Sequence, residues 1–386
     1  MRRTRLTPWL NPGNCAARKP ISRRTWIAGA GAAAVVLVCV AALLVPATRE
    51  TLQDTWCALT GRGCSRLEDP SRRDAAEGSG WRRQISPAEA AAWGNYVALG
   101  DSYSSGEGAG DYIEGTGDED GCRRSSHAYP ERVADTFDFT GALGFYACSR
   151  QRGASMLESL EEADSQIGQV RPHTSLVTLG IGGNDLGFTK VLRACMVRVP
   201  LMEATACRDQ EEDVAARMAE FDSTLDDILR EVRDRAPDAR ILVVGYPRIF
   251  PADPSGMYYT LAPGDQEWLN ETLRDFNTRV REKVADLDAE IVEDAQTGSV
   301  EYVRMATAIE GHEVGTDEPW LNGVLLGGFA EGVEVDHGTF HPNARGHEAF
   351  AQRVLHRLNA GPDRRLYVAE QTLDEAGAEI LADELD

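Results

Sequence analysis

The sequence predicts an α/β fold in which a parallel sheet is covered by helices on both faces. Four apolar runs have the length of buried strands, at residues 96–99, 143–147, 176–179 and 241–244. Segments with helical spacing follow three of these runs, at residues 129–137, 214–235 and 268–287. Glycine directly follows three of the runs, as is common where a strand ends in a turn. Because strands alternate with helices along the chain, we expect the helices to connect parallel strands.

The composition is that of an acidic globular protein. Of the 386 residues, 42% are hydrophobic, which is enough for a sizeable core. Asp and Glu number 62 against 40 Lys and Arg, so the net charge is -22. A field of this sign repels phosphate backbones, and we therefore expect no nucleic-acid partner.

Residues 1–47 are predicted to form a targeting segment. They carry seven basic residues and no acid, so the rest of the chain stands at 33 minus 62, or -29. The apolar stretch at 26–45 has the length of roughly 20 residues that spans a bilayer. Residues 22–27 resemble a twin-arginine export signal, and Ala47 offers a small residue at a cleavage position. A cleaved signal and a retained anchor both remain open, and both place the later residues outside the cell membrane.

The rest of the chain divides into three parts by composition. Residues 48–94 are charged and contain Gly and Ser, as expected of a lead-in and linker. The predicted strands and helices define a folded domain at 95–360. Residues 361–386 form an acidic tail, for which we expect either an amphipathic helix or a loosely held end.

The cysteines indicate an oxidising compartment. Six of the eight follow the apolar stretch, and an even number outside the cytoplasm predicts three disulfides. Of the connectivities that six cysteines allow, we favour pairing in sequence order, as Cys57–Cys64, Cys122–Cys148 and Cys195–Cys207. A zinc site is the alternative, and it is disfavoured because no Cys-x-x-Cys pair is present.

Candidate functional residues follow the predicted strands. Ligands of open parallel sheets bind beyond the carboxyl ends of the strands. Ser102 lies there, in a glycine-rich turn that could expose its hydroxyl, although a helix-capping serine is the alternative. Asn184 lies in a second glycine-rich loop after the third run and offers an amide donor. His341 comes near the end of the domain, just before a predicted helix.

Together these stretches resemble the SGNH, or GDSL, hydrolases, and in particular their secreted bacterial esterase subgroup. The resemblance covers residues 96–360 and is carried by 96–102, 121–126, 176–188, 245–248 and 341–346. It implies a flavodoxin-like, three-layer α/β/α sandwich and a serine esterase or lipase activity. It also implies a small-molecule or lipid ester as substrate, without metal or cofactor. We expect a monomer that touches a membrane only through an uncleaved N-terminal segment.

The resemblance assigns roles to individual residues. Ser102 would be the nucleophile and His341 the general base. The oxyanion hole would consist of the Ser102 N–H, the Gly153 N–H and the Asn184 amide. Related enzymes read Ala-Cys-Ser-Gly-Ala where this chain has Arg150–Arg152 before Gly153. We expect the glycine to stay in the oxyanion hole and the arginines to lie at the rim of the cleft.

The acid of the usual triad is missing. The family's aspartate lies three residues before the histidine, and that position is Gly338. We expect the Gly338 main-chain carbonyl to orient His341, with the Asp336 side chain as second choice. Asp101 is expected to hold the nucleophile turn by accepting main-chain N–H groups, and His347 to pack or cap.

Two alternatives belong to other functional classes. His337 and His341 are four residues apart, with His347, Asp336 and Glu348 nearby, and such clusters can bind zinc. Proline at 342 argues against both histidines lying on one helix face. The other alternative is an envelope-anchored binding protein that retains the fold without turnover, suggested by the missing acid and the arginine insertion.

Overall fold

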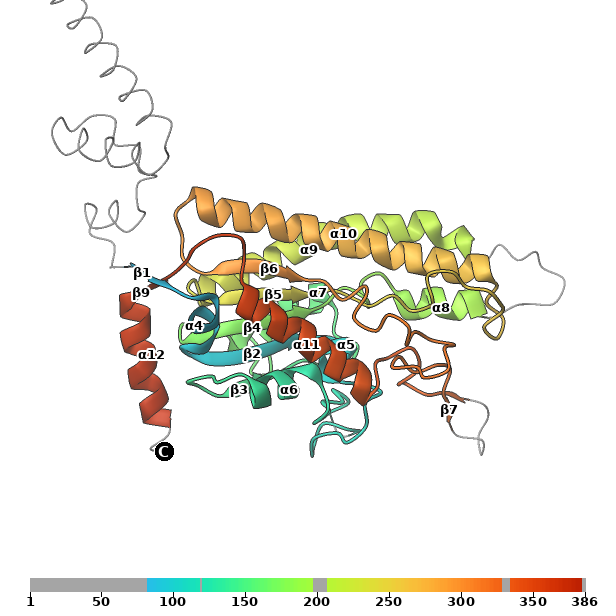
Figure 1. The fold of residues 1–386 in the computed structure, drawn as a ribbon, viewed down its shortest axis with the longest axis horizontal. Helices are drawn as coiled ribbons and strands as arrows, with labels where there is room; N and C mark the ends of the chain where they lie inside the picture. The colour runs from blue at the N-terminus through green and yellow to red at the C-terminus, as the bar shows by residue number, and fades with distance from the viewer. Residues whose placement is uncertain (1–81, 119, 197–206, 328–333, 384–386) are drawn as a thin grey trace, which may run out of the picture. The chain divides into compact units, whose positions relative to one another are not determined.

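The computed structural model describes residues 82–118, 120–196, 207–327 and 334–383. A parallel sheet of five strands lies at its centre, in the order β3-β2-β4-β5-β6 (Figure 1). The strands are β2 (Asn95–Gly100), β3 (Leu143–Phe145), β4 (Thr174–Gly180), β5 (Arg240–Val244) and β6 (Ser299–Val303). All neighbouring pairs are parallel, which confirms the predicted sheet.

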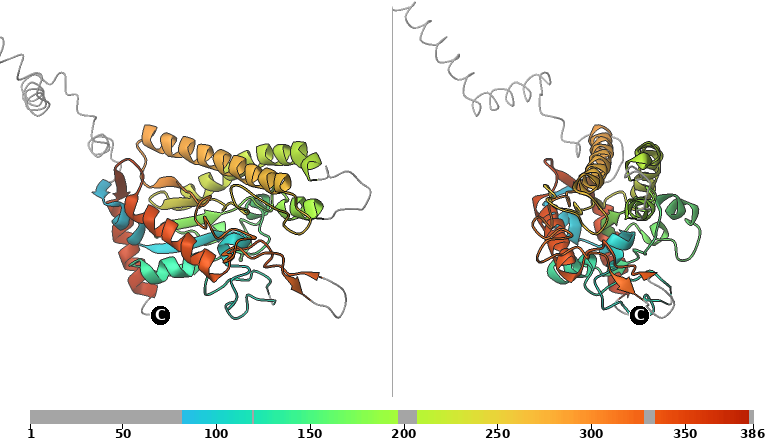
Figure 2. Two further views of the ribbon diagram at one scale, coloured as in Figure 1. Left: turned by 45° about the vertical axis from the view of Figure 1, so that its right-hand side comes forward. Right: turned by 90° about the vertical axis from the view of Figure 1, so that its right-hand side faces the viewer.

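Helices cover both faces of this sheet (Figure 2). One face carries α7 (Gly153–Glu158), α9 (Glu211–Arg235) and α10 (Pro263–Glu293). The other carries α4 (Pro87–Ala92), α6 (Tyr129–Thr136) and α11 (Ala344–Ala360). The strand order is that of flavodoxin, so the predicted three-layer α/β/α sandwich is confirmed.

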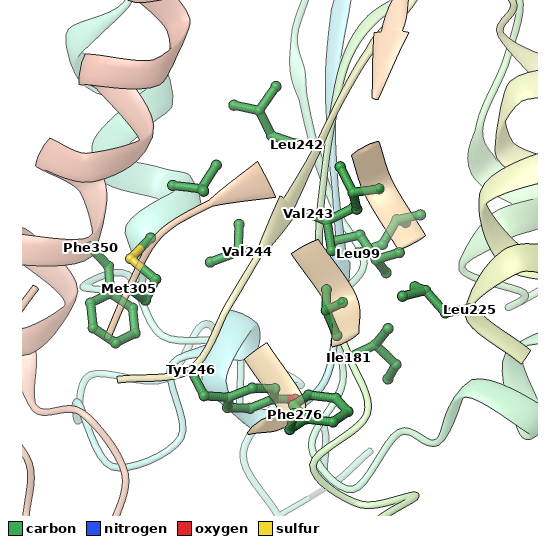
Figure 3. Close-up of a cluster of buried hydrophobic side chains, with 14 of the residues drawn as sticks. Leu99, Ile181, Leu225, Leu242, Val243, Val244, Tyr246, Phe276, Met305 and Phe350 are labelled. Atoms are coloured by element: carbon green, nitrogen blue, oxygen red, sulfur yellow. The ribbon is translucent and has the colours of Figure 1, made fainter. Parts of the chain in front are cut away.

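The core explains why the strands read as continuous apolar runs. In β5, Leu242 and Val244 point toward α11, whereas Val243 points to the face where Leu225 of α9 lies (Figure 3). Successive side chains of a strand alternate between faces, and here both faces are covered. These four side chains are at most 5% exposed. Every position of such a strand must therefore be apolar unless it has a partner.

Strand β6 is the exception and was not predicted. Its Glu301 is 1% exposed and pairs with Arg240 at the start of β5, at 2.8 and 3.0 Å. Arg357 of α11 lies 2.8 Å from the same carboxylate, and Ser299 donates to it at 2.7 Å. A buried charge is tolerated only with such partners. The acid interrupts the apolar pattern, and its charged partners lie far away in the sequence.

The folded unit extends beyond both predicted boundaries. Strand β1 (Arg82–Ile85) pairs antiparallel with β9 (Leu366–Ala369), and α4 packs on β2 and β4. Parts of the expected linker, 48–94, and of the expected tail, 361–386, therefore form regular elements. The charged residues of β1 hid this strand from the sequence pattern. Helix α12 (Glu370–Asp383) confirms the helical interpretation of the tail.

Shorter elements connect the main ones: α5 (Ser102–Ser105), η1 (Ile167–Gln169), α8 (Phe188–Met196), η2 (Arg208–Gln210), β7 (Leu326–Gly327) and β8 (Glu334–Val335). Two predicted disulfides are confirmed, Cys122–Cys148 and Cys195–Cys207. The Cys57–Cys64 pair and the segment 1–47 lie outside the described residues. Within the part of the chain that the structure describes, no helix is long and apolar enough to cross a membrane.

Candidate active site

Ser102 lies at the point where the strand order reverses. Strand β2 ends beside β4, with Gly100 opposite Gly180, and Ser102 begins the short helix α5. Gly100 has a φ of +137°, and a Cβ there would lie 2.4 Å from the Gly180 carbonyl oxygen. Only glycine therefore allows the chain to leave the sheet in this direction. The turn directs the Ser102 hydroxyl to the carboxyl edge of the sheet, where ligands of this fold bind.

Asp101 holds this turn, as the sequence predicted. It is the N-cap of α5, and its Oδ1 accepts the Tyr103 N–H at 3.0 Å. Its Oδ2 accepts the hydroxyl of Tyr246, whose own N–H donates to Asn277 at 2.9 Å. Burial raises the pKa of Asp101 to about 7, and these hydrogen bonds act against that rise. The nucleophile turn is thereby fixed to β5 and α10.

His341 meets Ser102 from a loop on the other side of the site. Its Nε2 lies 2.8 Å from Ser102 Oγ, and its Nδ1 lies 3.0 Å from the Thr339 carbonyl oxygen. The carbonyl can only accept, so Nδ1 carries the proton and Nε2 is free to take one from the serine. Burial lowers the pKa of His341, and the neighbouring Glu107 carboxylate opposes this.

The two groups expected to orient His341 have other partners. The Gly338 carbonyl accepts the His341 main-chain N–H at 3.1 Å, and Asp336 Oδ1 accepts the Gly338 N–H at 2.7 Å. The sequence-based choice of Gly338, with Asp336 second, is therefore wrong. Residues 336–341 form a tight turn with Phe340 at a φ of +60°, and this turn brings the Thr339 carbonyl to the ring.

Asn184 lies after β4, beside the nucleophile turn. Its amide donates to the Gln151 carbonyl at 3.0 Å, and the second N–H of the same amide remains for a ligand.

Gly153 differs from expectation. Its N–H donates to both carboxylate oxygens of Asp185, at 3.0 and 2.9 Å, because Gly153 begins helix α7. Its assignment to the oxyanion hole is therefore wrong.

Arg150 stands directly after Ala147-Cys148-Ser149, where related enzymes have the glycine. It follows Ser149, which bonds Glu107, and precedes Gln151, which accepts from Asn184. Its φ of +67° is a conformation that favours glycine. Among the described residues, no acceptor bonds the Arg150 N–H. Its side chain is exposed, as expected of a rim residue, with Nη2 3.5 Å from His337 Nδ1.

Sequence reasoning missed the partners of these groups. Thr339 and Tyr246 orient the histidine and the nucleophile turn, and Asp185 holds Gly153. Glu107 was not among the predicted site residues, yet it is 4% exposed and lies 3.7 Å from His341 Nε2. The signal that could have found it is an acid between two glycines, five residues after the nucleophile.

The histidine cluster does not have the arrangement of a metal site. His347 is fully buried, its Nδ1 accepts the Tyr129 N–H at 3.2 Å, and burial lowers its pKa to about 3. Its predicted packing role is thus confirmed. Across residues 82–383, apart from those the structure leaves undescribed, no three His, Cys, Asp or Glu side chains are arranged to bind a metal.

Known proteins are similar to this chain in fold and in sequence. The structure resembles that of phospholipase A1 from Streptomyces albidoflavus, with a TM-score of 0.56 and 31% identity over 68% of this chain and 98% of that one. It also resembles an extracellular lipase from Streptomyces rimosus, with a TM-score of 0.56 and 30% identity over 69% and 99%. Lipase 1 of Streptomyces coelicolor is 34% identical over 268 residues, which cover 67% of this chain and 84% of that protein.

The match also holds at the level of a whole family. Residues 98–349 match the sequence model of the GDSL-like Lipase/Acylhydrolase family. This range begins in β2, ends in α11 and includes Ser102, Asn184 and His341. The chain is therefore a carboxylic ester hydrolase that belongs to the GDSL-like lipase/acylhydrolase family, also called the SGNH hydrolases.

Proposed function

We propose that this protein is an exported serine esterase that hydrolyses acyl esters of lipids through Ser102 and His341. The observation that carries the proposal is the 2.8 Å contact between Ser102 Oγ and His341 Nε2. A nucleophile within hydrogen-bonding reach of a base, itself oriented by a third group, is the arrangement that activates a serine hydroxyl. Here the third group is the Thr339 carbonyl, 3.0 Å from Nδ1.

The first half of the reaction forms an acyl-enzyme. Ser102 Oγ attacks the ester carbonyl carbon while its proton passes to His341 Nε2. The carbonyl oxygen becomes an anion in the tetrahedral intermediate. When the bond to the alcohol breaks, His341 returns the proton to the leaving oxygen and the acyl group stays on Ser102.

The anion requires donors that are fixed before the reaction. We assign this role to the Ser102 N–H, the Asn184 amide and, in place of Gly153, the main-chain N–H of Arg150. The contacts that support the replacement are those of the neighbours: Ser149 bonds the nucleophile loop and Gln151 bonds Asn184. A main-chain donor does not depend on the side chain, so an arginine can stand where related enzymes have glycine.

The second half of the reaction regenerates the enzyme. A water molecule gives its proton to His341 Nε2 and attacks the acyl carbon, and the carboxylic acid leaves as Ser102 Oγ regains the proton. Every proton in the cycle passes between groups already within reach of Nε2. No metal or cofactor is needed for either half.

The substrate class and the location rest on the relatives and the N-terminal sequence. One solved relative is named as a lipase and another as a phospholipase A1. One of them is named as extracellular. The basic and apolar residues of 1–47 and the confirmed disulfides agree with export. Recovery of the protein in the cytoplasm of its source cell would contradict this part of the proposal.

Turnover of p-nitrophenyl esters, from acetyl to long acyl chains, tests the chemistry. We expect the wild-type protein to release p-nitrophenol and Ser102→Ala to lose roughly 10,000-fold or more in kcat. Both proteins should have the same far-UV circular dichroism, which shows that the loss is chemical. Turnover that survives in Ser102→Ala would contradict the mechanism, and loss with a chelator would favour the metal alternative. A folded protein without any turnover would favour the binding protein.

A further inference from the structure

His341 has no charged partner on its Nδ1 side. Nδ1 faces the neutral Thr339 carbonyl, and Asp336, the nearest acid along the chain, accepts the Gly338 N–H instead. When Nε2 takes the Ser102 proton, the ring becomes a cation in a mostly buried site. Such a cation is costly unless an anion lies close to it.

A buried carboxylate lies on the opposite side of the ring. Glu107 Oε2 is 3.7 Å from His341 Nε2, the nitrogen that becomes protonated. This is too long for a hydrogen bond, so Glu107 acts on the ring through its charge. Ser102 Oγ remains the hydrogen-bond partner of the same nitrogen at 2.8 Å, so the carboxylate does not displace the nucleophile.

Two side chains hold Glu107 in this position, and each of them directly follows one cysteine of a disulfide. Ser149 donates its hydroxyl to Glu107 Oε2 at 2.6 Å, and Arg123 Nη1 lies 3.3 Å from Oε1. Ser149 follows Cys148 and Arg123 follows Cys122, and these two cysteines are bonded. The Ser149 N–H also donates to the Cys122 carbonyl at 3.0 Å. One covalent link therefore fixes both groups that hold the carboxylate.

We propose that Glu107 is a positioning residue whose negative charge stabilises the His341 imidazolium, in place of the acid that the triad lacks. This proposal rests on the proposed roles of Ser102 and His341. The proton moves from Ser102 Oγ to His341 Nε2 and does not pass to Glu107. The carboxylate and the Arg123 guanidinium remain an ion pair throughout.

Other charged and titratable groups surround this pair. They come from every neighbouring segment: Asp101 after β2, Tyr112 and Arg123 in the following loop, Arg150 after β3, His337 in the histidine loop and His347 in α11. Among described residues, Glu107 is the one acid within ion-pair distance of His341. Its charge opposes the lowering of the His341 pKa by burial, whereas His337 adds to that lowering.

Glu107→Gln tests the proposal because it removes the charge and keeps the shape. With a soluble p-nitrophenyl ester, we expect kcat to fall about 10- to 100-fold, because the imidazolium that forms with the tetrahedral intermediate loses the neighbouring anion. KM should change little, because Glu107 does not contact the substrate in this scheme. The acid limb of kcat/KM against pH should move to lower pH, since His341 loses the neighbouring anion. A merely structural role would leave that limb in place.

Two further variants have distinct expected outcomes. Glu107→Asp keeps the charge, so the acid limb should return toward that of the wild type. Arg123→Gln removes the positive partner of Glu107, so the limb should move to higher pH. These two variants also test the proposal if Glu107→Gln does not fold. An unchanged kcat in folded Glu107→Gln, or an acid limb that stays in place in all three variants, would overturn the inference.

A measurement without turnover separates this inference from the proposed function. Nitrogen-15 NMR of labelled histidine, with the His341 signal identified by its loss in His341→Gln, reports the His341 pKa directly. We expect that pKa to be lower in Glu107→Gln than in the wild type. An inactive wild type would contradict the proposed function alone, whereas an unshifted His341 pKa would contradict the role of Glu107 alone.

Discussion

The nucleophile turn and the histidine loop are built in different ways. The turn at residues 100–105 is fixed by its own sequence: Gly100 supplies the positive φ, Asp101 caps the next N–H groups, and Ser102 follows. The loop at 336–341 gains its position from remote contacts, because Asn322 exchanges main-chain hydrogen bonds with Phe340 and His341. A short sequence motif can therefore predict a turn that its own residues fix. It cannot predict a loop whose position depends on remote contacts.

Gly108, three residues after the nucleophile turn, lies against the histidine loop. A Cβ at this residue would lie 2.8 Å from Asn322 Nδ2, 3.0 Å from His341 Cβ and 3.2 Å from Gly338 Cα. The Asn322 amide donates to the Gly108 and Gly338 carbonyls, at 2.9 and 3.2 Å. The distance between serine and histidine therefore depends on the absence of a side chain at Gly108.

Substitution at Gly108 should break the link between the two regions and have the largest effect. We expect Gly108→Ala to lower kcat/KM about 100-fold, since a displacement of the base by about 1 Å costs this much. Gly110→Ala is the matched control, because Gly110 also has a positive φ, +76°, but has no atom within 4 Å of a Cβ. Esterase assays compare the two, and equal losses would contradict the steric explanation.

The difference between local and remote contacts also explains which parts of the site could be predicted from the sequence. Ser102, Asn184 and His341 could be placed because each belongs to a short motif at the end of a strand or the start of a helix. Gly153 and Gly338 were misassigned because their partners depend on tertiary contacts. Asp185 reaches Gly153 across 32 residues, and the Thr339 carbonyl faces His341 only in the folded turn.

The fold shows the same limit. Three apolar runs became β2, β4 and β5 because their residues are buried on both faces of the sheet. Strand β6 carries Glu301, whose ion pair with Arg240 spans 61 residues, and no local pattern reveals it. Strand β1 was taken for linker because its partner β9 is almost at the other end of the chain.

Removal of the Tyr246 hydroxyl should weaken the nucleophile turn with an intermediate effect. In the wild type this hydroxyl donates to Asp101 and accepts the Gly183 N–H at 3.0 Å. Tyr246→Phe leaves the buried Asp101 carboxylate and the Gly183 N–H without that partner, which costs about 1–3 kcal/mol in the free energy of unfolding. Urea denaturation at pH 7 measures the loss. Tyr302→Phe, a change at an adjacent strand whose hydroxyl has no contact with Asp101, is the control, and equal losses would contradict the role of the Asp101 contact.

The smallest expected effect concerns the pH dependence of stability, which distinguishes the structural His347 from the reactive His341. His347 lies six residues after His341, yet it packs between α6 and α11, and burial lowers its pKa to about 3 from 6.5. The folded state therefore binds fewer protons than the unfolded state below pH 6.5, and stability contributed by the neutral ring is lost as pH falls. Asp101 acts with the opposite sign, because its pKa is raised to about 7 and its protonation favours the folded state as pH falls toward 4.

His347→Gln should remove the first of these two opposing contributions. Glutamine can still accept the Tyr129 N–H but does not titrate. As the pH falls from 7.5 to 5.8, the free energy of unfolding of the variant should rise by about 1 kcal/mol relative to that of the wild type. This is the size that linkage requires for a histidine that is not protonated in the folded state over this range. Urea denaturation at the two pH values measures this difference. His356→Gln on the same helix α11 is the control, and a pH-independent difference for His347→Gln would show that its ring titrates normally, as an exposed histidine does. In that case the contrast between a packed and a reactive histidine would have to be abandoned, because both rings would then be open to protons.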